Sequence, residues 1–266
     1  MAERWRATLF YFWRVLATAC CFAVFGLAGI VLGFVYFPLL NLFIWQRQRR
    51  IGLARTTIQT SFRLFIGLMQ LLRVLRYEVI GQERLERSGL LILANHPSLI
   101  DTVFLMALTG NAVGVLKAQL QKNFFMRGVV RAAGYIFNDQ GTALIDAGIS
   151  ALQAGSNLIM FPEGTRSPVD GAIHLKRGAA TIALRAQHNI TPVIIHCQPR
   201  MLGKTDHWWR VPSRAAKFRI EVMDDIDVTR FSDELGSGLP LAVAARHLTV
   251  FLQNYFIEEV QRHVRI

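Results

Sequence analysis

The stretch from Val15 to Trp45 contains no charged residue, and it limits the possible folds of this 266-residue chain more than any other feature. A straight helix of that length would measure about 45 Å, whereas the hydrocarbon core of a bilayer is about 30 Å thick. One tilted membrane span fits this length, and so does a helical hairpin that enters and leaves the same membrane face. The residues at which a hairpin could turn are Gly26, Gly29, Gly33 and Pro38. We expect residues 1–50 to be a membrane-anchoring segment, because core helices of soluble proteins rarely run so far without a charge.

Positive charge is concentrated beside this stretch. The chain has a formal net charge of +12, and residues 1–76 hold +9 of it, with ten Arg, no Lys and one Glu. Arginines on both sides of an apolar stretch suit the anionic head groups of membrane lipids. A nucleic-acid-binding protein would more often distribute its cations over a folded module. We therefore expect membrane lipids, and no nucleic acid, among the partners.

The cysteines and the arginines both bear on location. Cys20 and Cys21 are adjacent inside the apolar stretch and Cys197 is isolated, so the sequence provides no disulfide framework and is compatible with a reducing compartment. The denser arginine cluster at residues 47–55 favours the cytoplasmic side for that end of the stretch. We expect a membrane protein, of the bacterial inner membrane, with its active site on the cytoplasmic side.

The rest of the chain divides into two parts. Residues 51–76 have apolar side chains at helical spacing, which predicts an amphipathic helix at the membrane interface. Over residues 77–266 short apolar runs alternate with helical patterns, which predicts an α/β domain whose mixed, largely parallel sheet is flanked by helices. The expected strands are 77–81, 90–94, 112–116, 134–138, 157–161, 191–197 and 217–223. The expected helices are 100–109, 142–154, 176–187 and 240–262.

One expected strand runs directly into Asn95, His96 and Pro97. Active sites in open α/β sheets gather at the carboxyl ends of strands, which is where His96 lies. Asp101 follows five residues later, and Pro97 disfavours a regular helix through the histidine. A loop that turns into a helix can bring the carboxylate back to the imidazole. There it would fix the tautomer and leave the other ring nitrogen as a base.

A second expected strand ends in a polar turn, Phe161-Pro162-Glu163-Gly164-Thr165-Arg166-Ser167. Glu163 can accept hydrogen bonds from hydroxyl groups, and Gly164 permits a close approach of the backbone. Arg166 offers a planar fork that matches a phosphate. A surface turn with a structural Glu–Arg pair is the alternative explanation.

The two segments together resemble the signature blocks of the phosphate-lipid acyltransferase family, which includes lysophosphatidate and glycerol-3-phosphate acyltransferases. The resemblance covers residues 75–225. It implies a membrane-bound O-acyltransferase of phospholipid biosynthesis. Such an enzyme moves a fatty acyl group from acyl-CoA or acyl-carrier protein to the hydroxyl of a lysophospholipid such as 1-acylglycerol-3-phosphate. It also implies a hydrophobic tunnel or groove for the acyl chain.

The resemblance assigns roles to individual residues. His96 corresponds to the catalytic base and Asp101 to the residue that orients it. The residues that correspond to substrate-binding positions are Asn95, Lys117, Glu163, Gly164, Thr165, Arg166 and Lys176. The sequence has no nucleophile elbow, Walker loop, His-Glu-x-x-His or Cys-x-x-Cys pattern, so we expect no metal and no bound cofactor.

One position departs from the family pattern. Gln140 stands where the family usually has an arginine that helps to hold phosphate, and a glutamine cannot provide that charged fork. Arg127, Arg131 or Arg177 could compensate, or the acceptor could be an aminolipid, a glycolipid or a polyene-type lipid. A non-catalytic, lipid-binding member of the family is a further alternative. It predicts the loss of one of the two blocks, and both blocks are intact.

Overall fold

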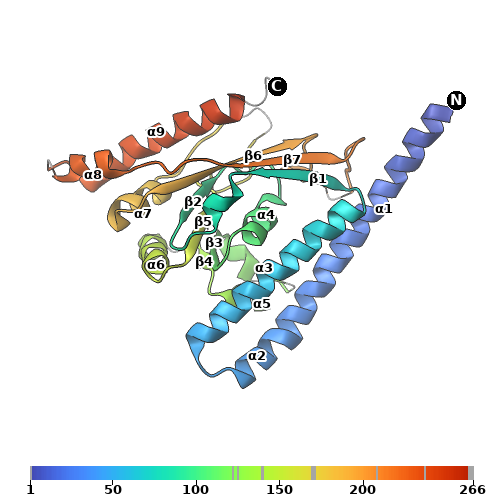
Figure 1. The fold of residues 1–266 in the computed structure, drawn as a ribbon, viewed down its shortest axis with the longest axis horizontal. Helices are drawn as coiled ribbons and strands as arrows, with labels where there is room; N and C mark the ends of the chain where they lie inside the picture. Colours follow the sequence, from blue (N-terminus) through green and yellow to red (C-terminus); the bar gives the residue numbers. More distant parts are fainter. Residues whose placement is uncertain are drawn as a thin grey trace.

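The N-terminal part of the chain is a helical hairpin (Figure 1). The computed structural model describes residues 2–121, 123–124, 126–138, 141–168, 172–207, 209–236 and 238–262. Helix α1 (Ala2–Val31) continues through a π-helical turn, η1 (Leu32–Tyr36), into α2 (Phe37–Phe43). The chain turns at residues 44–46, and α3 (Arg47–Leu71) then returns along α1.

The hairpin turns later than the glycines and Pro38 suggested. Pro38 lies in the first turn of α2, directly after the π-helical turn, where a residue without an N–H is accommodated in a continuing helix. Among the residues that the structure describes, Thr8–Phe43 is the one helical stretch long and apolar enough to cross a membrane. A helix covers most of the segment 51–76, but it begins at Arg47, ends at Leu71 and lies against α1. The Phe25 ring lies 6.2 Å from that of Phe62.

The domain is built on a seven-stranded sheet. Its strands are β1 (Leu75–Ile80), β2 (Leu91–Ala94), β3 (Ala112–Leu116), β4 (Ile136–Phe137), β5 (Asn157–Met160), β6 (Ile190–Gln198) and β7 (Ala216–Val222). The strand order is β1-β7-β6-β2-β5-β3-β4, and only the pairing of β6 with β7 is antiparallel among the described strands. These pairings confirm the predicted mixed, largely parallel sheet. Each strand coincides with a short apolar run of the sequence.

Helices cover both faces of this sheet (Figure 1). Those predicted by the sequence are α4 (Asp101–Leu108), α6 (Thr142–Gln153), α7 (Gly178–Ala186) and α9 (Leu241–Arg262). Two short helices, α5 (Arg127–Ala133) and α8 (Thr229–Gly236), were not predicted, and two 3₁₀ turns, η2 (Gln82–Leu85) and η3 (Ala118–Gln121), complete the elements. One apolar core joins the sheet to α4 and the hairpin, and a second joins it to α6, α7 and α9.

Two arginines of α3 attach the hairpin to the domain. Arg63 donates to the carbonyl of Ala107 at 2.8 Å, near the end of α4. Arg55 donates to the carbonyl of Ala133 at 3.0 Å, at the end of α5, and to the Asn111 side chain at 2.7 Å. The last carbonyls of a helix lack intrahelical partners and carry the negative end of its dipole, so these guanidinium groups stabilise both helix ends. The hairpin is thereby fixed to α4, the helix that begins at Asp101.

Candidate active site

The two chemistry-bearing segments meet at one edge of the sheet. Strands β2 and β5 are parallel neighbours, with Leu93 opposite Met160, so the loops that follow them leave the same edge. The β2 loop carries His96 and the β5 loop carries Glu163 to Ser167. The sequence prediction that these residues come together is consistent with this topology.

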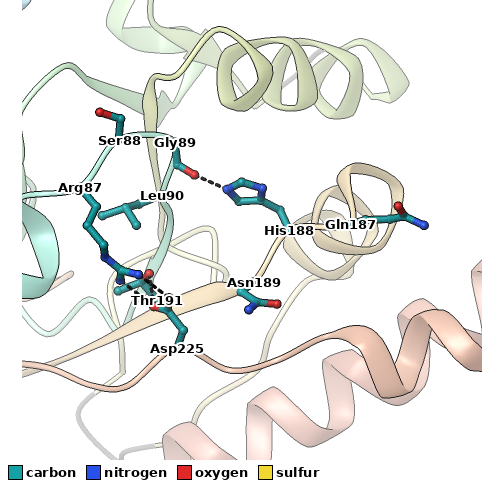
Figure 2. A pocket seen from close by; sticks show the side chains of 9 residues that line it. All are labelled: Arg87, Ser88, Gly89, Leu90, Gln187, His188, Asn189, Thr191 and Asp225. Atoms are coloured by element: carbon teal, nitrogen blue, oxygen red, sulfur yellow. Dashed lines mark hydrogen bonds and ion pairs between the residues drawn. The ribbon is translucent and has the colours of Figure 1, made fainter.

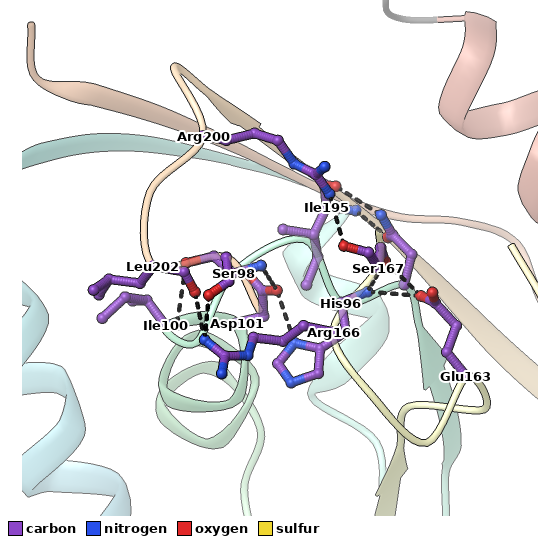
Figure 3. Close-up of polar contacts among 12 residues, drawn as sticks. His96, Ser98, Ile100, Asp101, Glu163, Arg166, Ser167, Ile195, Arg200 and Leu202 are labelled. Carbon is purple, nitrogen blue, oxygen red and sulfur yellow. Dashed lines mark hydrogen bonds and ion pairs between the residues drawn. The ribbon is translucent and has the colours of Figure 1, made fainter. Parts of the chain in front are cut away.

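His96 and Asp101 form a hydrogen-bonded pair (Figure 3). Nδ1 of His96 lies 3.0 Å from Oδ2 of Asp101, which also accepts a bond from the Ser98 amide at 2.7 Å. Asp101 begins α4, so the loop turns into a helix between the two residues as the sequence suggested. The imidazole stacks on the Phe161 ring at 4.0 Å. Within the described part of the chain Nε2 has no hydrogen-bond partner and remains available as a base.

The aspartate is completely buried, with 0% of its surface exposed. Burial raises the pKa of Asp101, while the hydrogen bonds from His96 and from the Ser98 amide oppose that rise. A carboxylate in this position holds the histidine in the tautomer that has its proton on Nδ1. The pair therefore has the arrangement that a general base requires.

Glu163 and Ser167 fix the backbone of the histidine. Oε1 of Glu163 accepts from the His96 amide at 3.1 Å and from the Ser167 hydroxyl at 2.6 Å. The Ser167 amide in turn donates to the His96 carbonyl at 2.7 Å. Burial raises the pKa of Glu163, and the bonds from Ser167 and His96 act against it. One Glu163 oxygen is therefore committed to the His96 loop.

Arg166 lies beside the histidine and is held from one side (Figure 3). Its Nη1 donates to the carbonyls of Leu202 and Gly203, at 2.8 and 2.7 Å. Its Nε and Nη2 have no hydrogen-bond partner within the described ranges. The guanidinium is thus oriented by the loop after β6 and keeps donors for a ligand.

The remaining predicted residues differ in their positions. The Asn95 amide bridges to β6 through the carbonyl and amide of Ile195, at 2.9 and 2.7 Å, so it anchors the loop.

Lys117 is exposed directly after β3, a strand that runs parallel to β5. Gly164 has a φ of +68°, and an added Cβ would lie 2.8 Å from Cε of Lys176, which places this lysine over the second block. Thr165 is half-buried in the same turn. Gln140 lies outside the described residues.

Arg200 is a residue of this site that the sequence reasoning missed. It donates to the carbonyls of Pro168 and Ser167, at 2.8 and 3.1 Å, and so braces the end of the second block. Its positive charge also acts against the rise in pKa of Asp101 and Glu163. No spacing rule connects Arg200 with either block, because the contact depends on how β6 leaves the sheet.

Two cavities lie away from the histidine. One, of ≈ 350 Å³, is at the opposite edge of the sheet, where β2 and β6 begin (Figure 2). Its charged groups already pair with one another, since Arg87 donates to Asp225 at 2.7 and 2.9 Å. The other, of ≈ 340 Å³, is apolar and lies between α1, α3 and α5, with Phe25, Phe62 and Val129 among its lining residues.

The sheet is largely parallel, and the histidine–aspartate pair follows the carboxyl end of its central strand, β2. Residues 76–196 match the family model described as Acyltransferase. The predicted family resemblance is therefore confirmed.

Known proteins with similar sequences carry related names. The 1-acyl-sn-glycerol-3-phosphate acyltransferase of Pseudomonas aeruginosa is 29% identical over 145 residues, which is 52% of this chain and 56% of the relative. The human 1-acyl-sn-glycerol-3-phosphate acyltransferase beta is 30% identical over 145 residues, or 50% of this chain and 49% of the relative. The chain thus spans about half the length of the curated relatives it matches.

A solved structure extends the likeness to almost the whole fold. The crystal structure of the 1-acyl-sn-glycerophosphate (LPA) acyltransferase PlsC from Thermotoga maritima superposes with a TM-score of 0.68. The superposition covers 95% of this chain and 96% of the other, at 20% sequence identity. At that identity the comparison establishes the fold alone, including the sheet flanked by helices.

Proposed function

We propose that this chain is a membrane-bound O-acyltransferase that transfers a fatty acyl group from a thioester donor to the hydroxyl of a lysophospholipid. The single observation that carries the proposal is the pair formed by His96 and Asp101, with Nε2 of the histidine open beside Arg166. Relatives named 1-acyl-sn-glycerol-3-phosphate acyltransferase support 1-acylglycerol-3-phosphate as the acceptor. The donor is acyl-CoA or acyl-carrier protein, and no bound cofactor takes part.

The reaction follows from the geometry of the pair. Nε2 of His96 takes the proton of the acceptor hydroxyl while the oxygen attacks the thioester carbonyl. Asp101 keeps the imidazole oriented and stabilises the imidazolium that forms. When the tetrahedral intermediate collapses, the C–S bond breaks and the thiolate takes the proton from Nε2. The acyl ester is the product, and no acyl-enzyme forms.

Acceptor recognition rests mainly on cations. Arg166 supplies Nε and Nη2 to the acceptor phosphate, while its Nη1 stays on the loop carbonyls. Lys117 and Lys176 lie exposed at the same edge of the sheet and add positive charge. Gly164 and Thr165 shape the turn, whereas Asn95 and Glu163 act through the His96 loop that they hold.

The hairpin attaches the enzyme to the membrane. Along α1, η1 and α2, large apolar side chains stay exposed on the face turned away from the domain: Leu16, Val24, Leu27, Val31, Val35, Leu39 and Leu42. The other face is fixed to the domain, so the exposed face lies in the bilayer and the active site beside it, on the cytoplasmic side of a bacterial inner membrane. The apolar cavity between α1, α3 and α5 receives an acyl chain.

An acceptor panel tests the substrate. Purified protein in lipid nanodiscs would receive radiolabelled acyl-CoA or acyl-carrier protein together with lysophosphatidate, 1-acylglycerol, a lysophosphatidylcholine or an aminolipid. Loss of a charged hydrogen bond costs roughly 1.5–3 kcal/mol, so we expect kcat/KM for lysophosphatidate to exceed that for 1-acylglycerol by about tenfold to a hundredfold. Equal rates would contradict phosphate recognition. Preference for an uncharged or amino acceptor would point to the lipid classes that Gln140 suggests.

A further inference from the structure

The loop between β6 and β7 begins at the active site. Its Leu202 carbonyl accepts from the Leu99 amide at 3.1 Å, in the segment between His96 and Asp101. The same carbonyl and that of Gly203 hold Arg166. Leu99 itself exposes its side chain at this point. The near end of the loop is therefore part of the mouth of the site.

The far end of the loop is tied to α1. Nε of Arg14 donates to the Pro212 carbonyl at 3.2 Å, and its Nη2 donates to the Ser213 carbonyl. Arg14 is the last charged residue before the charge-free stretch that starts at Val15. The adjacent Trp13 is exposed and donates its indole N–H to the Leu72 carbonyl at 3.1 Å. The loop thus lies beside the point where the apolar part of α1 begins.

Between these two attachments the loop exposes an aromatic residue and several cations. Trp209 is 52% exposed and stacks on His207, with the ring centroids 4.5 Å apart. The exposed cations of the segment are Lys204, Arg210 and Arg214. Its one carboxylate, Asp206, accepts the Gly203 amide at 2.7 Å and so belongs to the turn. Tryptophan and basic side chains are the residues that favour the interface of an anionic bilayer.

We propose that segment 203–214, of which the structure describes residues 203–207 and 209–214, is a second membrane-contact surface, which binds the head-group region of an anionic bilayer. This inference rests on the proposed function only in taking the acceptor from that bilayer. The segment joins the apolar face of α1 to the mouth of the site, so its docking places Arg166 at the level of the lipid phosphates. A lysophospholipid then reaches His96 without leaving the interface.

A depth measurement on the full chain tests this proposal. The environment-sensitive label NBD-maleimide would be attached to Thr205→Cys, in the segment, or to the control Asp233→Cys on α8, which lies at the other end of the molecule from α1 (Figure 1). Both carry Cys20→Ala and Cys21→Ala. Cys197 can stay, since it is buried and burial raises the pKa of its thiol to about 12. Vesicles of phosphatidylglycerol with phosphatidylcholine that carries a nitroxide on its head group quench NBD labels near the interface.

We expect the label at 205 to be quenched at least twofold more than the label at 233. Arg210→Gln with Arg214→Gln should lower this quenching at least twofold, whereas the charge-matched control Arg185→Gln with Arg246→Gln should leave it unchanged. Equal quenching at 205 and 233, in protein that floats with the vesicles, would overturn the proposal. The quenching measurement does not depend on catalytic activity. An inactive but quenched protein contradicts only the proposed function, and an active, unquenched one contradicts only the docking.

Discussion

Two buried carboxylates set the position of the His96 imidazole and of its backbone. Asp101 holds the ring and Glu163 holds the amide. Burial raises the pKa of both groups, so each is harder to ionise in the folded chain than in the unfolded one. Their ionisation therefore lowers the free energy of unfolding as the pH rises through the raised pKa. The buried carboxylates that hold His96 therefore lower the stability of the fold once they ionise.

Replacing Glu163 by glutamine tests the sign of this effect. Glutamine keeps an oxygen for the His96 amide and the Ser167 hydroxyl but cannot ionise. The wild type loses stability between the ordinary glutamate pKa, about 4.3, and the raised pKa of the folded protein. We expect the stability of Glu163→Gln relative to the wild type to grow as the pH rises through that window. Urea unfolding from pH 4 to pH 8 measures it, and a difference that shrinks with pH would refute the argument.

Arg166 offers a test of acceptor recognition at a single side chain. A lysine in its place keeps one positive charge but cannot hold the Leu202 and Gly203 carbonyls while presenting a second donor. We expect Arg166→Lys to raise KM for lysophosphatidate by about tenfold, with KM for 1-acylglycerol nearly unchanged. Steady-state kinetics with both acceptors gives the comparison. A parallel loss for both would assign Arg166 a structural role only.

The sequence predicted which residues lie at the same edge of the sheet, but it predicted few of their hydrogen-bond partners. Strand ends and the order of the two blocks placed His96, Asp101 and Arg166 at one edge. The commitment of one Glu163 oxygen to a backbone amide, and the contribution of Arg200, depend on loop paths that no spacing rule contains.

At the scale of helices and strands, the hairpin touches the domain through backbone as well as side chains. Gly33 in the π-helical turn lies against Gly128 of α5, where an added Cβ at residue 128 would come within 2.6 Å of the Gly33 Cα. Arg127 lies over the Phe34 ring at 5.4 Å beside this contact. A helix backbone can approach another this closely only where neither residue carries a side chain.

A pair of glycine substitutions measures how much this contact matters. Gly128→Ala overpacks the contact and should lower the free energy of unfolding by about 1–3 kcal/mol. Gly52→Ala, in the second turn of α3 with nothing within 4 Å of the added Cβ, should raise it by about 0.5–1 kcal/mol. Urea unfolding in detergent micelles compares the two. Equal effects would show that η1 and α5 are not in contact at Gly33.

Helices and strands could be predicted where a local pattern of apolar residues marks them. Continuous apolar runs fixed the strands to within about two residues, a usual margin for element ends. The strand β4, expected over 134–138, is shortened at both ends to Ile136–Phe137, because Gly134 ends α5 in the left-handed conformation, with φ +64°. The seven- and eight-residue helices α5 and α8 were missed, since so few residues show no clear period. The order of the strands in the sheet could not be predicted, because it depends on pairing between strands that are distant in the sequence.

For the whole molecule, one outer face is apolar and continuous with a basic loop. Leu27 is 62% exposed on α1, and Val250 is an exposed apolar residue on α9, across the sheet (Figure 1). A carboxylate in the hydrocarbon region costs about 2.5–3.5 kcal/mol, so Leu27→Asp should weaken vesicle partitioning roughly a hundredfold. Val250→Asp should leave it unchanged. Flotation with liposomes measures both, and equal partitioning of the two variants would place the membrane surface elsewhere.

The central claim is that His96 removes a proton from the acceptor hydroxyl, and His96→Ala tests it most directly. In the part of the chain that the structure describes, the imidazole stacks on the Phe161 ring and bonds to Asp101 alone, so the variant should fold and should float with liposomes as the wild type does. General-base catalysis contributes about 10²- to 10⁴-fold, so transfer of a radiolabelled acyl group to lysophosphatidate should fall by at least a hundredfold. Turnover by folded, membrane-bound His96→Ala at the wild-type rate would contradict the mechanism.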